Sequence, residues 1–336
     1  QGETSRLYRN LGDGTFEDAT EKAGVRNDDG KSLGVAMADF NDDGWPDLVI
    51  ANDTQPNFLY INQGDGTFDD IGLQAGIAYD EVGRARAGMG IDIADVSNSG
   101  KLSIAIGNFA REPISLYTQI DRTLFQDRAG AARITRPSLL KLTFGLLFAD
   151  LDLDGFADML VANGHIEPEI NAVQQDIAFA QSPQVFHNNR SGQLVDITDQ
   201  LDSSFRQPTV ARGLASADID GDGDLDVLMT VNAGAPKLFR NDLPAGQANW
   251  LKMRLQGKHP NLQAIGAKIT VFAGDLVQSR LVRTGSSYLS QSDVSEHIFG
   301  LGTATHADSI HVRWPASKEV AKYGKAESRQ TVSIRQ

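Results

Sequence analysis

One pattern occurs four times in this chain, and a repeated pattern restricts the fold more than any single motif does. The copies read GVAMADFNDDGWPDLVIAN from Gly34, GIDIADVSNSGKLSIAIGN from Gly90, GLLFADLDLDGFADMLVAN from Gly145 and GLASADIDGDGDLDVLMTVN from Gly213. Each copy places Ala-Asp before a short loop, a glycine five positions after that aspartate, and an apolar run that ends in asparagine. The loops start about 55 to 70 residues apart, a period that is typical of repeated structural units.

A second element recurs between these copies and predicts an outer pair of strands. It reads RLYRNLGDGTFED at 6–18, FLYINQGDGTFDD at 58–70, SLYTQIDRTLFQD at 115–127, QVFHNNRSGQLVD at 184–196 and KLFRND at 237–242. Asp-Gly between two strand-like runs is a strong hairpin signal. Each period therefore holds two hairpins, or about four strands, which is the content of one propeller blade.

We therefore expect an all-β fold in which residues 1–247 form a β-propeller of about four and a half blades. The glycine that opens each copy suits the crowded place where strands converge near a propeller axis. The first outer hairpin has no inner hairpin before it, so we expect a ring that is truncated on its N-terminal side. One segment, 164–183, departs from the repeat, and we expect a surface excursion there with a short helix over 172–180.

The repeated loops have the residue types that a calcium ion binds. Their pattern is Asp-x-Asp/Asn-x-Asp-Gly-x-x-Asp, and the oxygens at alternate positions of a turning loop point inward. The seventh residue would add a backbone carbonyl. An EF-hand is excluded because it needs a glutamate at position twelve, where this chain has Ile50, Val161 and Met229. Mg²⁺ is disfavoured because it keeps several waters and a strict octahedron.

The four loops differ in the number of carboxylates that they offer, which predicts three Ca²⁺ sites. The predicted ligands are Asp39, Asn41, Asp43, Trp45 and Asp47 in the first loop, Asp150, Asp152, Asp154, Phe156 and Asp158 in the third, and Asp218, Asp220, Asp222, Asp224 and Asp226 in the fourth, with Trp45, Phe156 and Asp224 acting through the main chain. The second loop, 95–103, keeps only Asp95 and is expected to be vacant or weak. Turns rich in Asp and Gly without metal are the alternative, and three copies with one spacing disfavour it.

Composition excludes several classes of protein. The net charge is −13, with 44 acidic and 31 basic residues, which argues against nucleic acid as a partner. The absence of cysteine excludes disulfide frameworks, zinc knuckles and thiol nucleophiles. Membrane insertion is not expected, because the best apolar run, 139–149, is interrupted by Lys141 and is shorter than a spanning helix.

The repeats resemble FG-GAP repeats, also called VCBS repeats, which form the blades of integrin-α-type propellers and carry Ca²⁺ in these loops. The later landmarks NGHIEPEI, NWLKMRL, AIGAKITVFAG, YLSQSD, FGLG and VRWP are similar to those of the cartilage acidic protein family, in which an ASPIC/UnbV domain follows the propeller. The resemblance implies a Ca²⁺-binding protein that is secreted or at the cell surface, and it implies no reaction. We expect a location outside the cell, at the cell surface or in a periplasm. Two features depart from it: the second loop has lost its ligands, and WPASKE at 314–319 lacks the Asp-Gly turn common there.

The repeat stops near Asn249, and we expect residues 248–336 to form a small β-sandwich-like domain. Alternating patterns predict strands at 250–255, 267–272, 277–283, 309–314 and 330–334. We expect one long polar loop at 285–302, where Tyr288, Gln291 and His297 either contact a partner or fix the loop on the sheet. Positive charge collects in this region and faces either a partner or the acidic propeller; the residues are Lys252, Arg254, Lys258, Lys268, Arg280 and Arg283.

Catalytic signatures are lacking: the sequence has no Gly-x-Ser-x-Gly elbow, Walker loop, Gly-x-Gly-x-x-Gly or His-Glu-x-x-His. We therefore predict a non-catalytic scaffold that binds an unknown protein or glycan, as in adhesion. The alternative is a propeller-based hydrolase or glycan-processing module in which His165, Glu167 and Glu169 supply the chemistry.

Overall fold

The computed structural model describes residues 2–244, 246–317 and 319–336, and these residues form an all-β molecule, as the repeats predict. The helical segments among them are short: α1 (Thr135–Ser138), α2 (Ile170–Val173) and the 3-10 turn η1 (Thr198–Gln200). None of these helices has the length and apolar character that crossing a membrane requires. The fold is therefore determined by how its sheets are arranged.

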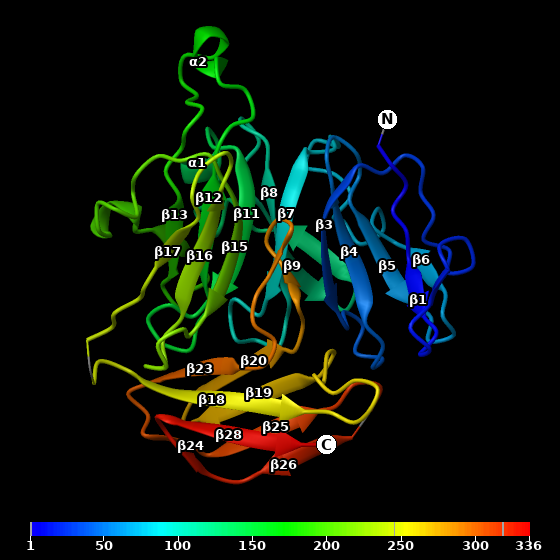
Figure 1. The fold of residues 1–336 in the computed structure, drawn as a ribbon, viewed down its shortest axis with the longest axis vertical. Helices are drawn as coiled ribbons and strands as arrows, with labels where there is room; N and C mark the ends of the chain where they lie inside the picture. Colours follow the sequence, from blue (N-terminus) through cyan, green and yellow to red (C-terminus); the bar gives the residue numbers. More distant parts are fainter. Residues whose placement is uncertain (1, 245, 318) are drawn as a thin grey trace.

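Each repeat folds as an antiparallel meander, and the meanders stand side by side around a common centre in the upper part of Figure 1. One complete meander consists of β3 (Ser32–Ala38), β4 (Asp47–Asn52), β5 (Phe58–Asn62) and β6 (Phe68–Asp70). The next consists of β7 (Gly88–Ala94), β8 (Ser103–Asn108), β9 (Ser115–Asp121) and β10 (Leu124–Asp127). A further one consists of β11 (Thr143–Ala149), β12 (Asp158–Asn163), β13 (Gln184–Asn188) and β14 (Leu194–Asp196). The last sheet has β15 (Ala211–Ala217), β16 (Asp226–Val231) and β17 (Lys237–Phe239), and the first is the hairpin of β1 (Tyr8–Asn10) and β2 (Phe16–Asp18). This is the predicted propeller architecture.

Glycine allows the innermost strands to approach one another closely. Strands β3, β7, β11 and β15 contact their neighbours in that order. A Cβ added at Gly90 would lie 2.2 Å from the carbonyl oxygen of Phe144, and one at Gly145 would lie 2.3 Å from that of Arg212. Real Cβ atoms essentially never come that close to backbone. The glycine that opens each copy is therefore a requirement of packing near the axis.

The C-terminal residues form a sandwich of two sheets below the propeller (Figure 1). One sheet holds β18 (Asn249–Gln256), β23 (His297–Gly302) and β28 (Gln330–Arg335), and the other holds β19 (Lys268–Ala273), β20 (Leu276–Leu281), β25 (Ser309–Arg313) and β26 (Val320–Tyr323). A small pair, β24 (His306–Ala307) and β27 (Ala326–Glu327), accompanies them. Leu251, Val271, Phe299 and Val312 belong to one buried cluster between the sheets. The five strands predicted from the sequence of this region are all present.

The expectation of one long loop over 285–302 is wrong. Residues 285–291 form a short hairpin of β21 (Gly285–Ser286) and β22 (Ser290–Gln291), which enters the centre of the propeller (Figure 1, orange), and the segment ends in β23. The backbone N–H of Ile91 donates to the carbonyl of Ser287 at 3.1 Å, and that of Leu214 donates to the Ser287 hydroxyl at 3.0 Å. The hairpin is ordered by inner strands of the propeller, which its own sequence does not reveal.

The helix expected over 172–180 is also wrong. The excursion at 164–183 contains only the single turn α2. Gln174 has an extended backbone, which ends the helix, and Ile170 and Ile177 turn into one buried cluster with Phe144. Packing of these two isoleucines against the propeller therefore replaces a longer helix.

Candidate metal centre

The four repeated loops join the two innermost strands of their sheets. In each loop the first aspartate follows the last residue of β3, β7, β11 or β15, and the ninth residue begins β4, β8, β12 or β16. The loop glycines have φ between 82° and 101° in Gly44, Gly100, Gly155 and Gly223, a region that favours glycine. In every copy the glycine N–H donates to an oxygen of the first aspartate, at 2.6–3.1 Å. The turn therefore fixes the orientation of that carboxylate.

The aspartate at the ninth position of each acidic loop has a structural role that the sequence did not reveal. One oxygen of Asp158 accepts the N–H of Leu151 at 3.1 Å, and the other accepts the N–H of Asn188 on β13 at 2.8 Å. Asp47 and Asp226 make the equivalent pairs of bonds within their own repeats. This aspartate ties the loop to the third strand of the sheet, so its carboxylate is a structural group whether or not a metal binds.

The third loop brings its carboxylates together. Oxygens of Asp150, Asp152 and Asp154 all lie within 4.8 Å of one another. Burial, reinforced by the neighbouring carboxylates, raises the pKa of Asp150 to about 8 and that of Asp152 to about 6. The Oδ1 atom of Asp150 is buried and has no hydrogen-bond partner among the described residues. This loop therefore has crowded acidic oxygens that need a positive charge.

Two side chains from the β13–β14 hairpin add to this loop, and the sequence pattern gave no signal for them. His187 Nδ1 lies 3.2 Å from Asp158 and 3.6 Å from Asp152, and these carboxylates raise the pKa of the imidazole. Arg190 Nε donates to Asp154 Oδ2 at 2.6 Å. Both side chains come from the same hairpin and approach the carboxylates of the loop, and the guanidinium of Arg190 brings a positive charge to Asp154.

The fourth loop also brings its carboxylates together, with one difference from prediction. Oxygens of Asp218, Asp220 and Asp222 lie within 4.8 Å of one another. Asp224, expected to act only through its main chain, has a buried side chain whose Oδ1 lacks a partner among the described residues. Burial raises the pKa of Asp224 to about 7. Its carboxylate is thus a further candidate ligand.

The first loop is more open than the other two acidic loops. Asn41 Nδ2 donates to Asp43 Oδ2 at 2.8 Å, and Asp43 Oδ1 accepts the N–H of Trp45 at 2.7 Å. Burial raises the pKa of Asp39, and it raises that of Asp47 to about 7. Among the described residues, its carboxylates do not form a group of three with oxygens within 4.8 Å. The amide of Asn41 takes the place of a third carboxylate.

The second loop closes through hydrogen bonds among its own residues. Its single carboxylate, Asp95, accepts the N–H groups of Ser99 and Gly100 at 3.0 and 2.6 Å. The hydroxyls of Ser97 and Ser99 lie 2.9 Å apart and bond each other. The serines therefore satisfy the turn with neutral groups.

The donor sets of the third and fourth loops fit a hard cation. Carboxylate, amide and carbonyl oxygens are the ligands that Ca²⁺ takes. A buried carboxylate oxygen without a partner costs about 1–3 kcal/mol or more, and the third and fourth loops each contain one, on Asp150 and Asp224. A bound cation would satisfy both oxygens and relieve the repulsion that raises these pKa values.

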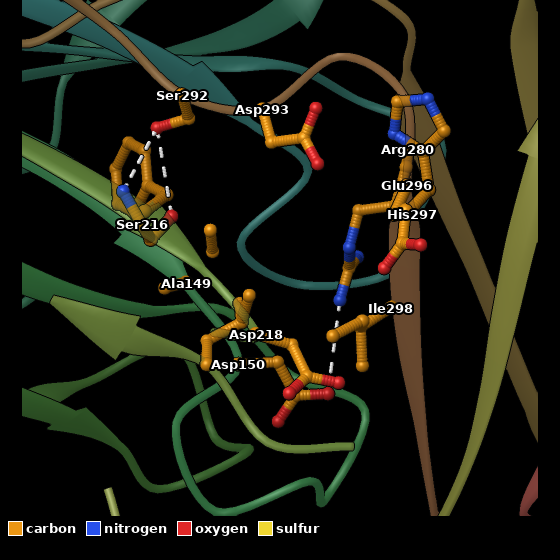
Figure 2. A pocket seen from close by; sticks show the side chains of 13 residues that line it. Ala149, Asp150, Ser216, Asp218, Arg280, Ser292, Asp293, Glu296, His297 and Ile298 are labelled. Carbon is orange, nitrogen blue, oxygen red and sulfur yellow. Dashed lines mark hydrogen bonds and ion pairs between the residues drawn. The ribbon is translucent and has the colours of Figure 1, made fainter. Parts of the chain in front are cut away.

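A cavity of about 120 Å³ lies between the loops and the sandwich, and Figure 2 shows the side chains that line it. Its floor includes Asp150 and Asp218, the first aspartates of the third and fourth loops, and its other wall includes Arg280, Asp293 and His297. Burial lowers the pKa of His297 to about 4. The cavity places the acidic loops directly against ionisable groups of the C-terminal domain.

The other candidate residues do not form a catalytic group. His165 is buried, packs edge-to-face against Phe109 with ring centroids 5.2 Å apart, and accepts the N–H of Glu167 at Nδ1. Glu167 and Glu169 are exposed. Tyr288 packs on Phe144 with ring centroids 4.9 Å apart, so this residue of the 285–302 segment fixes the hairpin in the propeller.

Comparison with protein families accounts for most of the chain. Residues 1–50, 39–106 and 170–229 match the family of FG-GAP-like repeats, and residues 257–336 match the ASPIC and UnbV family. The chain belongs to the proteins that join FG-GAP-like repeats to an ASPIC and UnbV domain. The FG-GAP-like matches include the first and fourth acidic loops, and the ASPIC and UnbV match covers most of the sandwich.

Two similar proteins, from different organisms, share one name with each other. The chain is 28% identical to cartilage acidic protein 1 of Xenopus tropicalis over 295 residues, which is 85% of this chain and 42% of the relative. It is 27% identical to cartilage acidic protein 1 of Homo sapiens over 318 residues, which is 91% of this chain and 44% of the relative. The chain thus spans less than half the length of these relatives.

Similar solved structures come from sugar-binding proteins, at low similarity. An Agrocybe aegerita lectin that recognises non-reducing terminal N-acetylglucosamine gives a TM-score of 0.39 at 18% identity, over 75% of this chain and 66% of that chain. A Bombyx mori beta-fructofuranosidase in complex with sucrose gives 0.34 at 8% identity, over 91% of this chain and 78% of that chain.

Proposed function

We propose that this FG-GAP-like repeat protein is a non-catalytic scaffold that binds Ca²⁺ through its first, third and fourth loops. The ligands would be the residues predicted at loop positions one, three, five, seven and nine, with the Asp224 carboxylate added. The second loop would stay empty. We also propose the domain division suggested by the sequence, a propeller over 1–247 and a sandwich over 248–336.

The observation that carries this proposal is the unpartnered, buried Oδ1 of Asp150 within a group of three aspartates. Carboxylates about 4 Å apart repel by about 4 kcal/mol per pair at a dielectric near 20. A cation bound to such a group would relieve this repulsion. The second loop, which has lost the carboxylates, satisfies its turn with neutral serines, and this contrast supports a metal in the other loops.

We place the partner, a protein or a glycan, on the propeller face opposite the sandwich. The sandwich lies against the loops, and the excursion carrying α2 projects from the far side (Figure 1). Ile166 and Val173 of that excursion are exposed by 57% and 81%. Such a scaffold would act outside the cell or in a periplasm, where Ca²⁺ is abundant enough for binding sites of modest affinity.

A hydrolase has no comparable support among the described residues. The imidazole of His165 is buried and its Nδ1 is occupied by a backbone N–H. General acid–base catalysis needs a titratable pair within hydrogen-bond reach of a substrate. The exposed Glu167 and Glu169 do not supply such a pair with this histidine.

Calorimetric titration of the metal-stripped chain with Ca²⁺ tests the proposal. We expect three ions per chain, and weaker binding of Mg²⁺. Asp154→Ala should remove one ion, since Asp154 belongs to the group of the third loop. Asp95→Ala is the matched control and should leave the count at three. No uptake by the wild-type chain, or four equal sites, would contradict the proposal.

A further inference from the structure

The C-terminal sandwich contacts the first aspartate of each of the three acidic loops. These contacts join residues more than 30 positions apart in the chain and come from three different strands, β18, β23 and β25. In each case the sandwich donates to Oδ2 of the aspartate. A contact repeated in all three loops is a property of the interface and not of one residue.

Arg313 provides the contact to the first loop. Its NH2 group donates to Asp39 Oδ2 at 2.9 Å, and its NH1 group lies 3.3 Å from Asp42 Oδ1. The Oδ1 atom of Asp39 accepts only the N–H of Asp43 within the loop, at 3.1 Å, among the described residues. The arginine therefore holds the carboxylate from outside the loop and leaves its other oxygen turned inward.

Backbone groups of β23 provide most of the contact to the third loop. The N–H of Gly300 donates to Asp150 Oδ2 at 3.1 Å, and the N–H of Gly302 donates to the carbonyl of Leu153 at 2.9 Å. Arg280 lies 3.8 Å from the same Oδ2, as the dashed line in Figure 2 marks. Asp150 Oδ1 has no partner in the described part of the chain. Again the sandwich uses one oxygen and leaves the other free.

Lys252 and Trp250 of β18 provide the contact to the fourth loop. Lys252 Nζ donates to Asp218 Oδ2 at 2.5 Å and lies 3.0 Å from Glu296 of the sandwich. The indole of Trp250 lies against Gly223, where an added Cβ would meet the ring at 2.0 Å. The loop glycine is thus needed twice, for its positive φ and for the approach of this ring.

The second loop has no such contact to its first aspartate. Among the described residues, the carboxylate of Asp95 accepts hydrogen bonds only from Ser99 and Gly100 of its own loop. Its Asn98 amide donates instead to the carbonyl of Gly155 in the third loop, at 2.9 Å. The sandwich therefore holds the first aspartate in each loop predicted to bind metal, and not in the loop predicted to be empty.

We propose that the sandwich forms the outer shell of the three calcium sites, so that calcium binding and docking of the sandwich on the propeller stabilise each other. This inference rests on the proposed function. Groups that hold the unbound oxygen of a ligand fix its orientation before the metal arrives, and their loss weakens metal binding. In return, a bound cation removes the repulsion within each loop and keeps it in the conformation that the sandwich contacts. Lys252 and Arg313 are therefore positioning residues for the metal.

Calcium titration of Arg313→Gln tests this on the full chain. We expect one of the three sites to weaken by about tenfold while the other two keep their affinity. Arg313→Lys, which keeps the charge, should recover part of the loss. Arg335→Gln is the matched control, because Arg335 is exposed on β28, and its three affinities should equal those of the wild type.

Lys252→Met gives a second, independent test at the fourth loop. Calcium should change the fluorescence of Trp250, identified by its loss in Trp250→Phe, and the midpoint of this change should move to about tenfold higher calcium in Lys252→Met. If the wild type binds three ions and both variants bind them equally well or more tightly, the inference is wrong while the proposed function stands. If the wild type binds none, the proposed function fails and the inference fails with it.

Discussion

Replacing Asp150 by asparagine should stabilise the metal-free protein, which is the reverse of the usual effect of changing a buried residue. Asp150 is 3% exposed, and burial raises its pKa from 3.8 to about 8. At pH 7 the folded state therefore retains a proton that the unfolded state has lost. Each unit of pKa shift corresponds to 1.36 kcal/mol, so about three units between the unfolded pKa and pH 7 cost about 4 kcal/mol of stability.

Asparagine removes that cost and keeps most of the local bonds. Its carbonyl oxygen can accept the N–H groups of Gly155 and Gly300 in place of Asp150 Oδ2. Its NH₂ group would then point toward the neighbouring carboxylates, which accept hydrogen bonds. Asparagine does not reproduce every contact of the carboxyl group, which offsets about 1–3 kcal/mol. A net gain of about 1–3 kcal/mol remains in the absence of metal.

Urea denaturation at pH 7, in EDTA and in excess Ca²⁺, measures the stability of the metal-free protein and the stability that Ca²⁺ adds. In EDTA the midpoint of Asp150→Asn should exceed that of the wild type. The extra stability gained on adding Ca²⁺ should be smaller in the variant, because a ligand has been lost. Asp95→Asn, at the same position of the second loop, should change neither quantity. A variant that is less stable than the wild type in EDTA would refute the reasoning.

Three further outcomes follow from the same contacts. Chelation should lower the melting temperature, since each site loses about 2.7 kcal/mol when calcium falls from a hundred times its Kd to zero; a melting temperature that is equal in EDTA and in calcium would refute this. The raised pKa values of Asp47, Asp150 and Asp224, about 7, 8 and 7, mean that the metal-free fold binds protons that the unfolded chain does not. Its stability in EDTA should therefore fall as pH rises from about 4 to 8, and urea midpoints at pH 5 and pH 8 check the sign. Gly90→Ala should cost about 3 kcal/mol or more because its Cβ would meet backbone at 2.2 Å, whereas Gly324→Ala, where the space is open, should be nearly neutral in the same assay.

The inner hairpins could be predicted because each has its own local signal. An aspartate, a glycine five positions later and an apolar run define the loop, and the structure places β11 and β12 on either side of 150–157, as this pattern predicts. The glycine at the start of each copy predicted crowding, and Gly90 against the Phe144 carbonyl shows it. Local sequence carries this information because the turn and the strand after it are specified within about ten residues.

The errors occurred where distant residues decide the conformation. The segment 285–291 is mostly polar, with serine at three of its seven positions, so it has no strand signal of its own. It is ordered by hydrogen bonds from Ile91 and Leu214 in the propeller. The helix expected over 172–180 is replaced by a single turn because Ile177 packs inward. Contacts between residues this far apart leave no periodic pattern in either segment.

Basic residues of the C-terminal region form ion pairs with acidic residues of the propeller. Sequence alone left open whether they face a partner or the propeller. The structure shows that Lys252 pairs with Asp218, and that Arg283 pairs with the buried Asp92 of β7. These ion pairs cannot neutralise the acidic loops fully, since the third loop keeps the pKa of Asp150 near 8 even with Arg280 beside it. The second loop shows that the same turn forms with one carboxylate, so the turn itself does not require the others. The additional carboxylates of the other three loops therefore support the proposal that those loops bind a cation.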